Sequence, residues 1–236
     1  PDLVKVAVQD EMPALALTDL SNLHAAIKFY EACLKKGIKP ILGSVIRLND
    51  AEHRATLLAM SNTGWRNLTE IVSRGFIEGQ QLGIPCVKKD WVLEQAEDLI
   101  VLLGQHSDVG KMLCSSNPQK AEPLLEAWIE KFGNQVYLAL TRTERVGEED
   151  YIQQAVKLAA KYQLGVVAHN DVHFIEQDDF EAHEARVCIA DGYVLGDDKR
   201  PKTYSSEQYF KTAVQMSELF ADLPAALENS YHIAKR

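Results

Sequence analysis

The sequence predicts an α/β protein in which a parallel sheet curls into a barrel covered by helices. Short apolar segments of strand length alternate with amphipathic segments of helical period along most of the chain. Some short segments, such as 166–168, are apolar at every position, as strands are when helices cover the sheet. Polar residues then follow at the carboxyl end, here His169 to His173, which is the end where β/α barrels carry their chemistry.

Strands and helices are predicted to alternate in a fixed order. Apolar runs bounded by glycine, proline or short polar residues predict the strands, and apolar residues three or four apart predict the helices. The predicted strands cover residues 13–18, 38–48, 55–60, 98–103, 136–140 and 165–173. The predicted helices cover residues 3–11, 23–34, 62–72, 91–96, 109–114, 117–132, 150–164, 178–190, 205–220 and 224–235. The glycine- and proline-containing segments 78–90 and 191–204 are predicted to be loops.

The helix over 23–34 illustrates how each helical face is assigned. It ends at Gly37, since glycine readily takes the left-handed conformation that closes a helix. Helical spacing predicts that one apolar stripe faces the core. The stripe consists of Leu23, Ala26, Ile27, Tyr30 and Leu34.

Helical patterns separate most of the six strands, which favours a parallel sheet because strand–helix–strand units cross over with one hand. The helical start of the chain leads us to expect one further strand before Pro1. Seven strands would close a distorted, TIM-like (β/α)7 barrel. An open doubly wound sheet is the alternative, although the sequence has neither a Gly-x-Gly-x-x-Gly nor a P-loop motif.

Composition and charge limit the classes of partner. The formal net charge is −9 and the pI is about 5.3, so we expect little direct DNA binding by this domain. The sequence has no apolar run of the roughly 18 residues that a membrane helix needs. The four cysteines lack Cys-x-x-Cys spacing and are expected to be reduced, which predicts a cytoplasmic protein.

The candidate metal ligands are Asp171 and His173. They lie two positions apart, so on an extended chain both side chains point to one face. A carboxylate and an imidazole can bind a divalent metal of the zinc or manganese type, but a tight site needs further ligands from other strand ends. His169 is expected to pair with Asp19 or Asp171, and His183 is expected to be solvated or salt-linked.

Several segments occur in an order that resembles a known family. These segments are 14–19 (ALALTD), 37–43 (GIKPILG), 62–68 (NTGWRNL), 99–102 (LIVL), 170–173 (NDVH), 204–209 (YSSEQY) and 218–229 (ELFADLPAALEN). With them the chain resembles the PHP domain of the bacterial replicative DNA polymerase III alpha subunits, and this similarity extends over nearly its whole length.

The resemblance implies a distorted barrel whose strand ends can hold three metal ions for phosphoester hydrolysis. This sequence departs from that pattern at most ligand positions. The first histidines of the family precede Pro1, and a leucine and a valine cannot coordinate a cation. The departures are Leu20 for a histidine, Val45 for a glutamate, Arg54 for a histidine (with His53 one residue away) and Gln105 for a cysteine. Asp171 and His173 match, as a remnant of the ligand set that we expect to be unoccupied.

The resemblance implies residues 1–200 as the PHP barrel and 201–236 as a helical segment leading toward the polymerase core. We expect a non-catalytic scaffold that needs no cofactor and docks the proofreading exonuclease (epsilon) subunit. The parent chain would be a DNA-directed DNA polymerase that uses Mg²⁺. The alternative is an active metal-dependent phosphoesterase, whose divalent metals would need ligands from the strand before Pro1. An unrelated barrel enzyme is a third possibility, without a nucleophile–base pair to support it.

Overall fold

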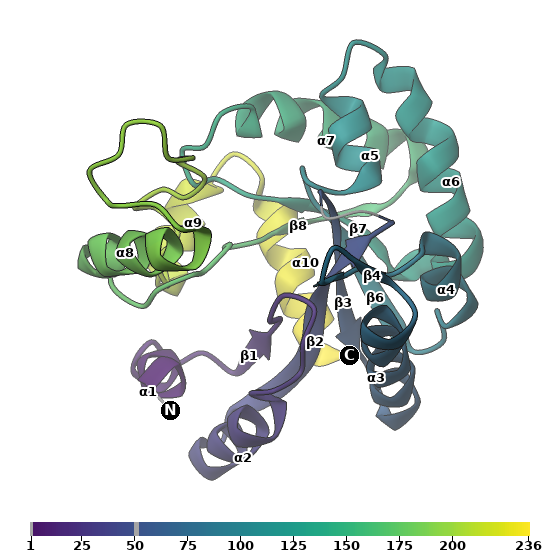
Figure 1. The fold of residues 1–236 in the computed structure, drawn as a ribbon. Coiled ribbons are helices and arrows are strands. Elements are labelled where there is room, and N and C mark those ends of the chain that lie inside the picture. Colours follow the sequence, from purple (N-terminus) through teal and green to yellow (C-terminus); the bar gives the residue numbers. More distant parts are fainter. Residues whose placement is uncertain (1, 50–51) are drawn as a thin grey trace.

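The computed structural model describes residues 2–49 and 52–236 of the chain. These residues form a six-stranded sheet that curls into a half-barrel flanked by helices (Figure 1). The fold class predicted from the sequence is therefore confirmed. The strand order is β1-β2-β3-β6-β7-β8. The strands are β1 (Ala14–Leu17), β2 (Lys39–Leu48), β3 (His53–Ala59), β6 (Leu99–Leu103), β7 (Val136–Leu140) and β8 (Gly165–Ala168).

Helices cover the outer face of the curled sheet, and α10 lies beside β8. None of the helices in the described ranges is long and apolar enough to span a membrane. The helices are α1 (Asp2–Gln9), α2 (Ala26–Lys36), α3 (Asn62–Ile77), α4 (Lys89–Glu94), α5 (Asp108–Leu113), α6 (Ala121–Phe132), α7 (Glu148–Tyr162), α8 (Phe180–Asp191), α9 (Ala213–Leu219) and α10 (Pro224–Lys235). A small hairpin, β4 (Gln80–Gln81) with β5 (Ile84–Pro85), lies within the predicted loop 78–90.

The prediction of an all-parallel sheet is wrong for β3, which runs antiparallel to both β2 and β6. The chain has only residues 49–52 between β2 and β3. A parallel connection needs a crossover of a dozen or more residues, so this short link permits only a hairpin. The other pairs, β1 with β2, β6 with β7 and β7 with β8, are parallel as predicted.

Side chains alternate between the two faces of the sheet and build two cores. On the outer face, Leu57 and Leu103 pack with Trp128 of α6, and all three are fully buried. On the inner face, Leu58 and Leu102 belong to a smaller buried cluster together with Ile233 of α10. A third cluster joins α1, β1 and α2.

The C-terminal helix α10 packs against the edge of β8. The Asn229 amide donates a hydrogen bond to the carbonyl of Val166 (2.8 Å), and Lys39 at the start of β2 donates to the carbonyl of Ala234 (2.8 Å). The predicted helix over 205–220 forms only in its second half. Its first half instead lies against the chain after β8, where Tyr209 makes a bridge to Phe174. The backbone hydrogen bonds of this contact replace those of a helix.

The predicted core stripe of α2 is only partly correct. Its buried residues are Ala26, Phe29 and Cys33, whereas Ile27 and Leu34 are 64% and 55% exposed. The helix is rotated because Phe29 and Cys33 pack in the cluster with α1 and β1. In the segments 178–190 and 150–164, the helices begin and end within two residues of the prediction.

Candidate functional site

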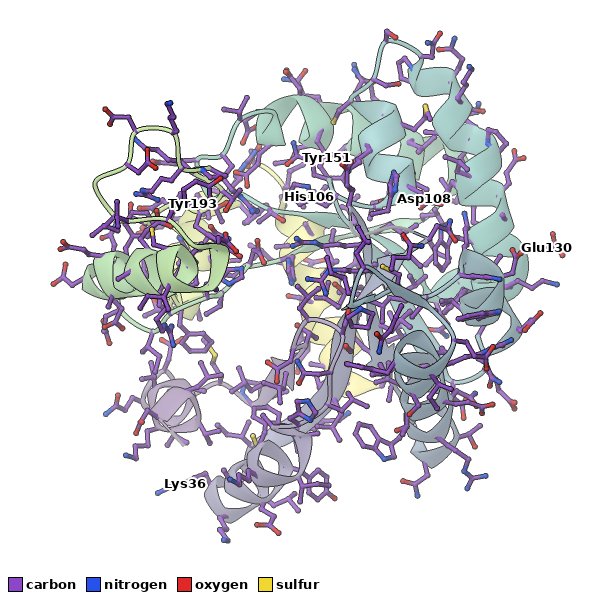
Figure 2. The ribbon with its side chains drawn as sticks, viewed as in Figure 1. Lys36, His106, Asp108, Glu130, Tyr151 and Tyr193 are labelled. Carbon is purple, nitrogen blue, oxygen red and sulfur yellow. The ribbon has the colours of Figure 1, made fainter. Side chains whose placement is uncertain are left out.

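The polar strand ends meet at one mouth of the half-barrel. The amide of Val45 donates to the carbonyl of Asp19 (3.1 Å), which places the end of β1 beside β2. The amide of Arg54 donates to the carbonyl of His106 (2.8 Å), so the start of β3 lies beside the end of β6. Figure 2 labels His106 in the central part of the molecule, beneath α7. At the other edge, the chain after β8 leads into Asp171.

Asp171 lies in a network of donors at this mouth. Its Oδ2 lies 2.9 Å from Arg145 Nη2 and accepts a hydrogen bond from the side-chain amide of Gln208 at 2.9 Å. Its Oδ1 lies 3.5 Å from His173 Nε2. Burial alone would raise the pKa of Asp171, but the hydrogen bond from His173 and the neighbouring positive charges outweigh it and hold the pKa well below its usual range. The carboxylate is therefore ionised and already neutralised by protein groups.

This arrangement does not fit a metal cluster. Among the residues that the structure describes, no group of three or more histidine, cysteine, aspartate or glutamate side chains could hold a metal ion. Leu20 and Val45 bridge each other through their backbones, so two positions where ligands were expected by resemblance come together with apolar side chains. Arg145 in turn occupies an oxygen of Asp171 and adds a positive charge. The interpretation of Asp171 and His173 as an unoccupied ligand remnant stays a prediction.

An aromatic cluster fixes the ring of His173. The centroid of the His173 ring lies 4.7 Å from that of Tyr204 and 5.4 Å from that of His183. The expectation that His183 is solvated is wrong, because its side chain is buried between these rings and Phe174. Its Nε2 has no hydrogen-bond partner within the described residues. Burial lowers the pKa of His183, and the charge of His173 lowers it further.

The first residue of α7, Glu148, supplies a buried carboxylate. Glu148 accepts hydrogen bonds from the Thr143 amide and hydroxyl, both at 2.6 Å, and its Oε1 lies 3.2 Å from Arg145 Nε. This carboxylate holds Arg145 in the orientation that reaches Asp171.

Comparison with known proteins decides the family. A model of the PHP domain matches residues 1–143. The chain belongs to the PHP domain family. Over 99–100% of its length it is 47%, 45% and 44% identical to DNA polymerase III subunit alpha from Pseudomonas aeruginosa, Vibrio cholerae and Escherichia coli, respectively. This PHP domain spans about a fifth of the length of each of these relatives.

A solved structure is also similar to this PHP domain. A candidate metal-dependent phosphoesterase from Bifidobacterium adolescentis gives a TM-score of 0.46, with 12% identity, over 72% of this chain and 80% of that chain. A likeness at this level carries no argument about the activity of the PHP domain.

Sequence reasoning missed several residues of the mouth in this PHP domain. Arg145 and Gln208 come from a loop and from the C-terminal segment, outside the strand ends that were searched. Arg47 faces Arg54 across β2 and β3, and His106 follows β6. The alternation of β2 carries a signal for Arg47, since that position falls on the inner face. Arg145 and Gln208 have no comparable signal in the sequence.

Proposed function

We propose that this PHP domain is part of a DNA polymerase III alpha subunit and serves there as a non-catalytic scaffold. Its similarity to alpha subunits over 99–100% of the chain supports the first part. The observation that carries the second part is the ion pair of 2.9 Å between Arg145 and Asp171. It places a fixed guanidinium where a metal-binding carboxylate would need a cation. We further propose that the domain contacts the polymerase core of the same chain and docks the proofreading exonuclease (epsilon) subunit.

A scaffold depends on its packing and not on the residual ligands. The inner core of Leu58, Leu102 and Ile233 and the outer core around Trp128 are built from apolar side chains that do not involve the mouth. The fold can therefore persist after ligand residues are replaced, as in barrels where the strand ends and the core vary independently. The same reasoning assigns this domain no cofactor, whereas the polymerase core would use Mg²⁺.

The test compares His173→Ala with the matched control His232→Ala in the full-length subunit. His232 lies exposed on α10, away from the mouth. Three quantities are measured: affinity for the exonuclease subunit, primer extension and hydrolysis of a phosphoester in the presence of Zn²⁺ or Mn²⁺. A scaffold predicts that both variants keep exonuclease affinity and primer extension within about twofold of the unmutated protein.

The phosphoesterase alternative predicts a different pattern. In that case the unmutated protein would hydrolyse the phosphoester in a metal-dependent way, and His173→Ala would abolish the hydrolysis while His232→Ala would not. That pattern would overturn the non-catalytic part of the proposal. Failure of the exonuclease subunit to bind the unmutated subunit would overturn the docking part.

A further inference from the structure

Helix α2 carries apolar side chains on two of its faces. One face is buried, and its residues are Ala26, Phe29 and Cys33. A second stripe, which we call the outer stripe, consists of Ile27, Tyr30 and Leu34, and these side chains are 64%, 44% and 55% exposed. Residues three and four positions apart are neighbours on a helix, so the outer stripe is one continuous apolar surface. Surface helices normally have one apolar stripe, which faces the core, so this second stripe indicates a surface that another segment covers.

The outer stripe is held in a fixed position. Gly37 ends the helix in the left-handed conformation (φ 74°), and its amide donates to the carbonyl of Leu34 (3.2 Å). Because Phe29 and Cys33 pack on the other face with α1 and β1, the helix cannot turn the outer stripe inward without exposing them. A covering segment would therefore meet a surface that is already ordered, which lowers the entropy cost of the contact.

Helix α10 ends beside the end of α2. Lys39 follows Gly37 by two residues, and its Nζ donates to the carbonyl of Ala234 in the last turn of α10 (2.8 Å). One turn earlier, Tyr231 is 52% exposed. Figure 1 shows the C-terminal end of the chain and α2 in the lower part of the molecule. Since this PHP domain spans about a fifth of the length of its relatives, the chain that follows Arg236 in a full-length subunit would emerge close to the outer stripe.

Lysines border the outer stripe. Lys28, Lys35 and Lys36 are exposed on α2, with Lys36 at the periphery of the molecule in Figure 2, whereas Glu31 is the one carboxylate of this helix. Within residues 2–49 and 52–236, none of these lysines forms an ion pair with a carboxylate. In a domain with a formal net charge of −9, this local excess of positive charge favours an acidic covering segment. It disfavours a second copy of the domain, because the lysines of the two copies would face each other.

We propose that the outer stripe of α2, together with Tyr231, is covered by the part of the polymerase chain that follows Arg236. The covering segment presents apolar side chains to the stripe and acidic side chains to the lysines beside it. Burial of the stripe drives the contact, and the charges fix its orientation. This inference rests on the proposed place of the domain in an alpha subunit, and it adds which surface of the domain meets the rest of that chain.

The test is photo-crosslinking in the full-length subunit. Tyr30 is replaced by the photoreactive benzoylphenylalanine, and the products are mapped by mass spectrometry of peptides. We expect a product that joins position 30 to residues beyond 236 of the same chain, with a yield that does not depend on protein concentration. The matched control carries the same replacement at Phe76, which is 42% exposed near the end of α3. A product between two copies, no product, or an equal yield from both positions would overturn the proposal.

Variants decide whether the outer stripe carries the contact. Leu34→Glu should remove most of the product from position 30, because it places a carboxylate at the centre of an apolar contact. Ile189→Glu, at a side chain that is 81% exposed on α8, is the control and should leave the yield unchanged. A yield that survives Leu34→Glu would overturn the proposal.

Lysine-reactive crosslinking of the same subunit separates this inference from the proposed function. Crosslinks between the PHP domain and the rest of the chain, with none from position 30, would overturn only the assignment to α2. If no crosslink of either kind joined the two parts, the proposed contact with the polymerase core would also be wrong.

Discussion

Leu102→Ala should strongly destabilise this domain. Leu102 lies on β6 between Thr56 and Tyr137 in the register of the sheet and is only 6% exposed. The substitution removes three carbon atoms, which amounts to about 2 kcal/mol of lost transfer free energy. The remaining cavity adds to this cost, and buried Leu→Ala changes cost about 2–5 kcal/mol in all. Because Ile233 of α10 can partly move into the space, we expect a loss of about 3 kcal/mol.

The matched control is Leu82→Ala, the same chemical change at a side chain that is fully exposed at the tip of the β4–β5 hairpin. It should alter stability by less than about 0.5 kcal/mol. The measurement is the urea dependence of hydrogen exchange at the Leu99–Leu103 amides in the full-length subunit, because a local probe reports this domain even when other domains unfold separately. A loss for Leu102→Ala no larger than that for Leu82→Ala would refute the role assigned to the inner core.

Three further changes test the electrostatics of the structure. Arg54→Gln should stabilise the domain by about 0.2–1 kcal/mol in chloride, because it removes the like charge opposite Arg47. Urea-dependent hydrogen exchange measures this change, and a loss of stability would show that the Arg47–Arg54 pair is favourable. Stability should fall as the pH drops below about 6.5, because burial and the nearby arginines lower the pKa of His106 in the folded state while the unfolded chain takes up the proton. In a pH series of melting temperatures His106→Gln should flatten this decline, and an unchanged slope would exclude His106 as its source. Arg142→Ala should speed amide exchange in α9. Arg142 contacts the Leu219 carbonyl (2.6 Å), Asp222 (2.6 Å) and Glu149 (2.8 Å), and so joins the end of α9 to the start of α7. Unchanged exchange in α9 would show that these contacts do not hold the segment.

The strands could be predicted from the sequence because burial requires apolar residues along them. Every residue of β6 and β7 is buried, and both appear in the sequence as continuous apolar runs. The direction of β3 could not be read from such a run, since an apolar strand has the same pattern in either direction. The prediction of a helix over the first half of 205–220 was wrong for another reason. Its residues have helical spacing, yet Tyr209 pairs after β8 with Phe174, which lies 35 residues earlier in the chain.

The site could be predicted only where it lies on strand ends. Arg54 and Asp171 occupy the mouth because β3 begins there with Arg54 near its start, and β8 ends there three residues before Asp171. The partners of Asp171 could not be foreseen: Gln208 lies 37 positions away in the sequence, and Arg145 comes from the loop before α7. These contacts arise from packing of the C-terminal segment against the mouth, which no local pattern records.

The metal content of the mouth tests the central proposal most directly. The full-length subunit and its His173→Ala variant are incubated with Zn²⁺ and Mn²⁺, freed of loose ions and analysed by mass spectrometry of the elements. If the domain is a non-catalytic scaffold, the two proteins will carry the same number of these ions per chain, because Arg145 already neutralises Asp171. If the unmutated protein instead holds two or more ions that His173→Ala removes, the mouth is a working metal centre and the scaffold account is wrong.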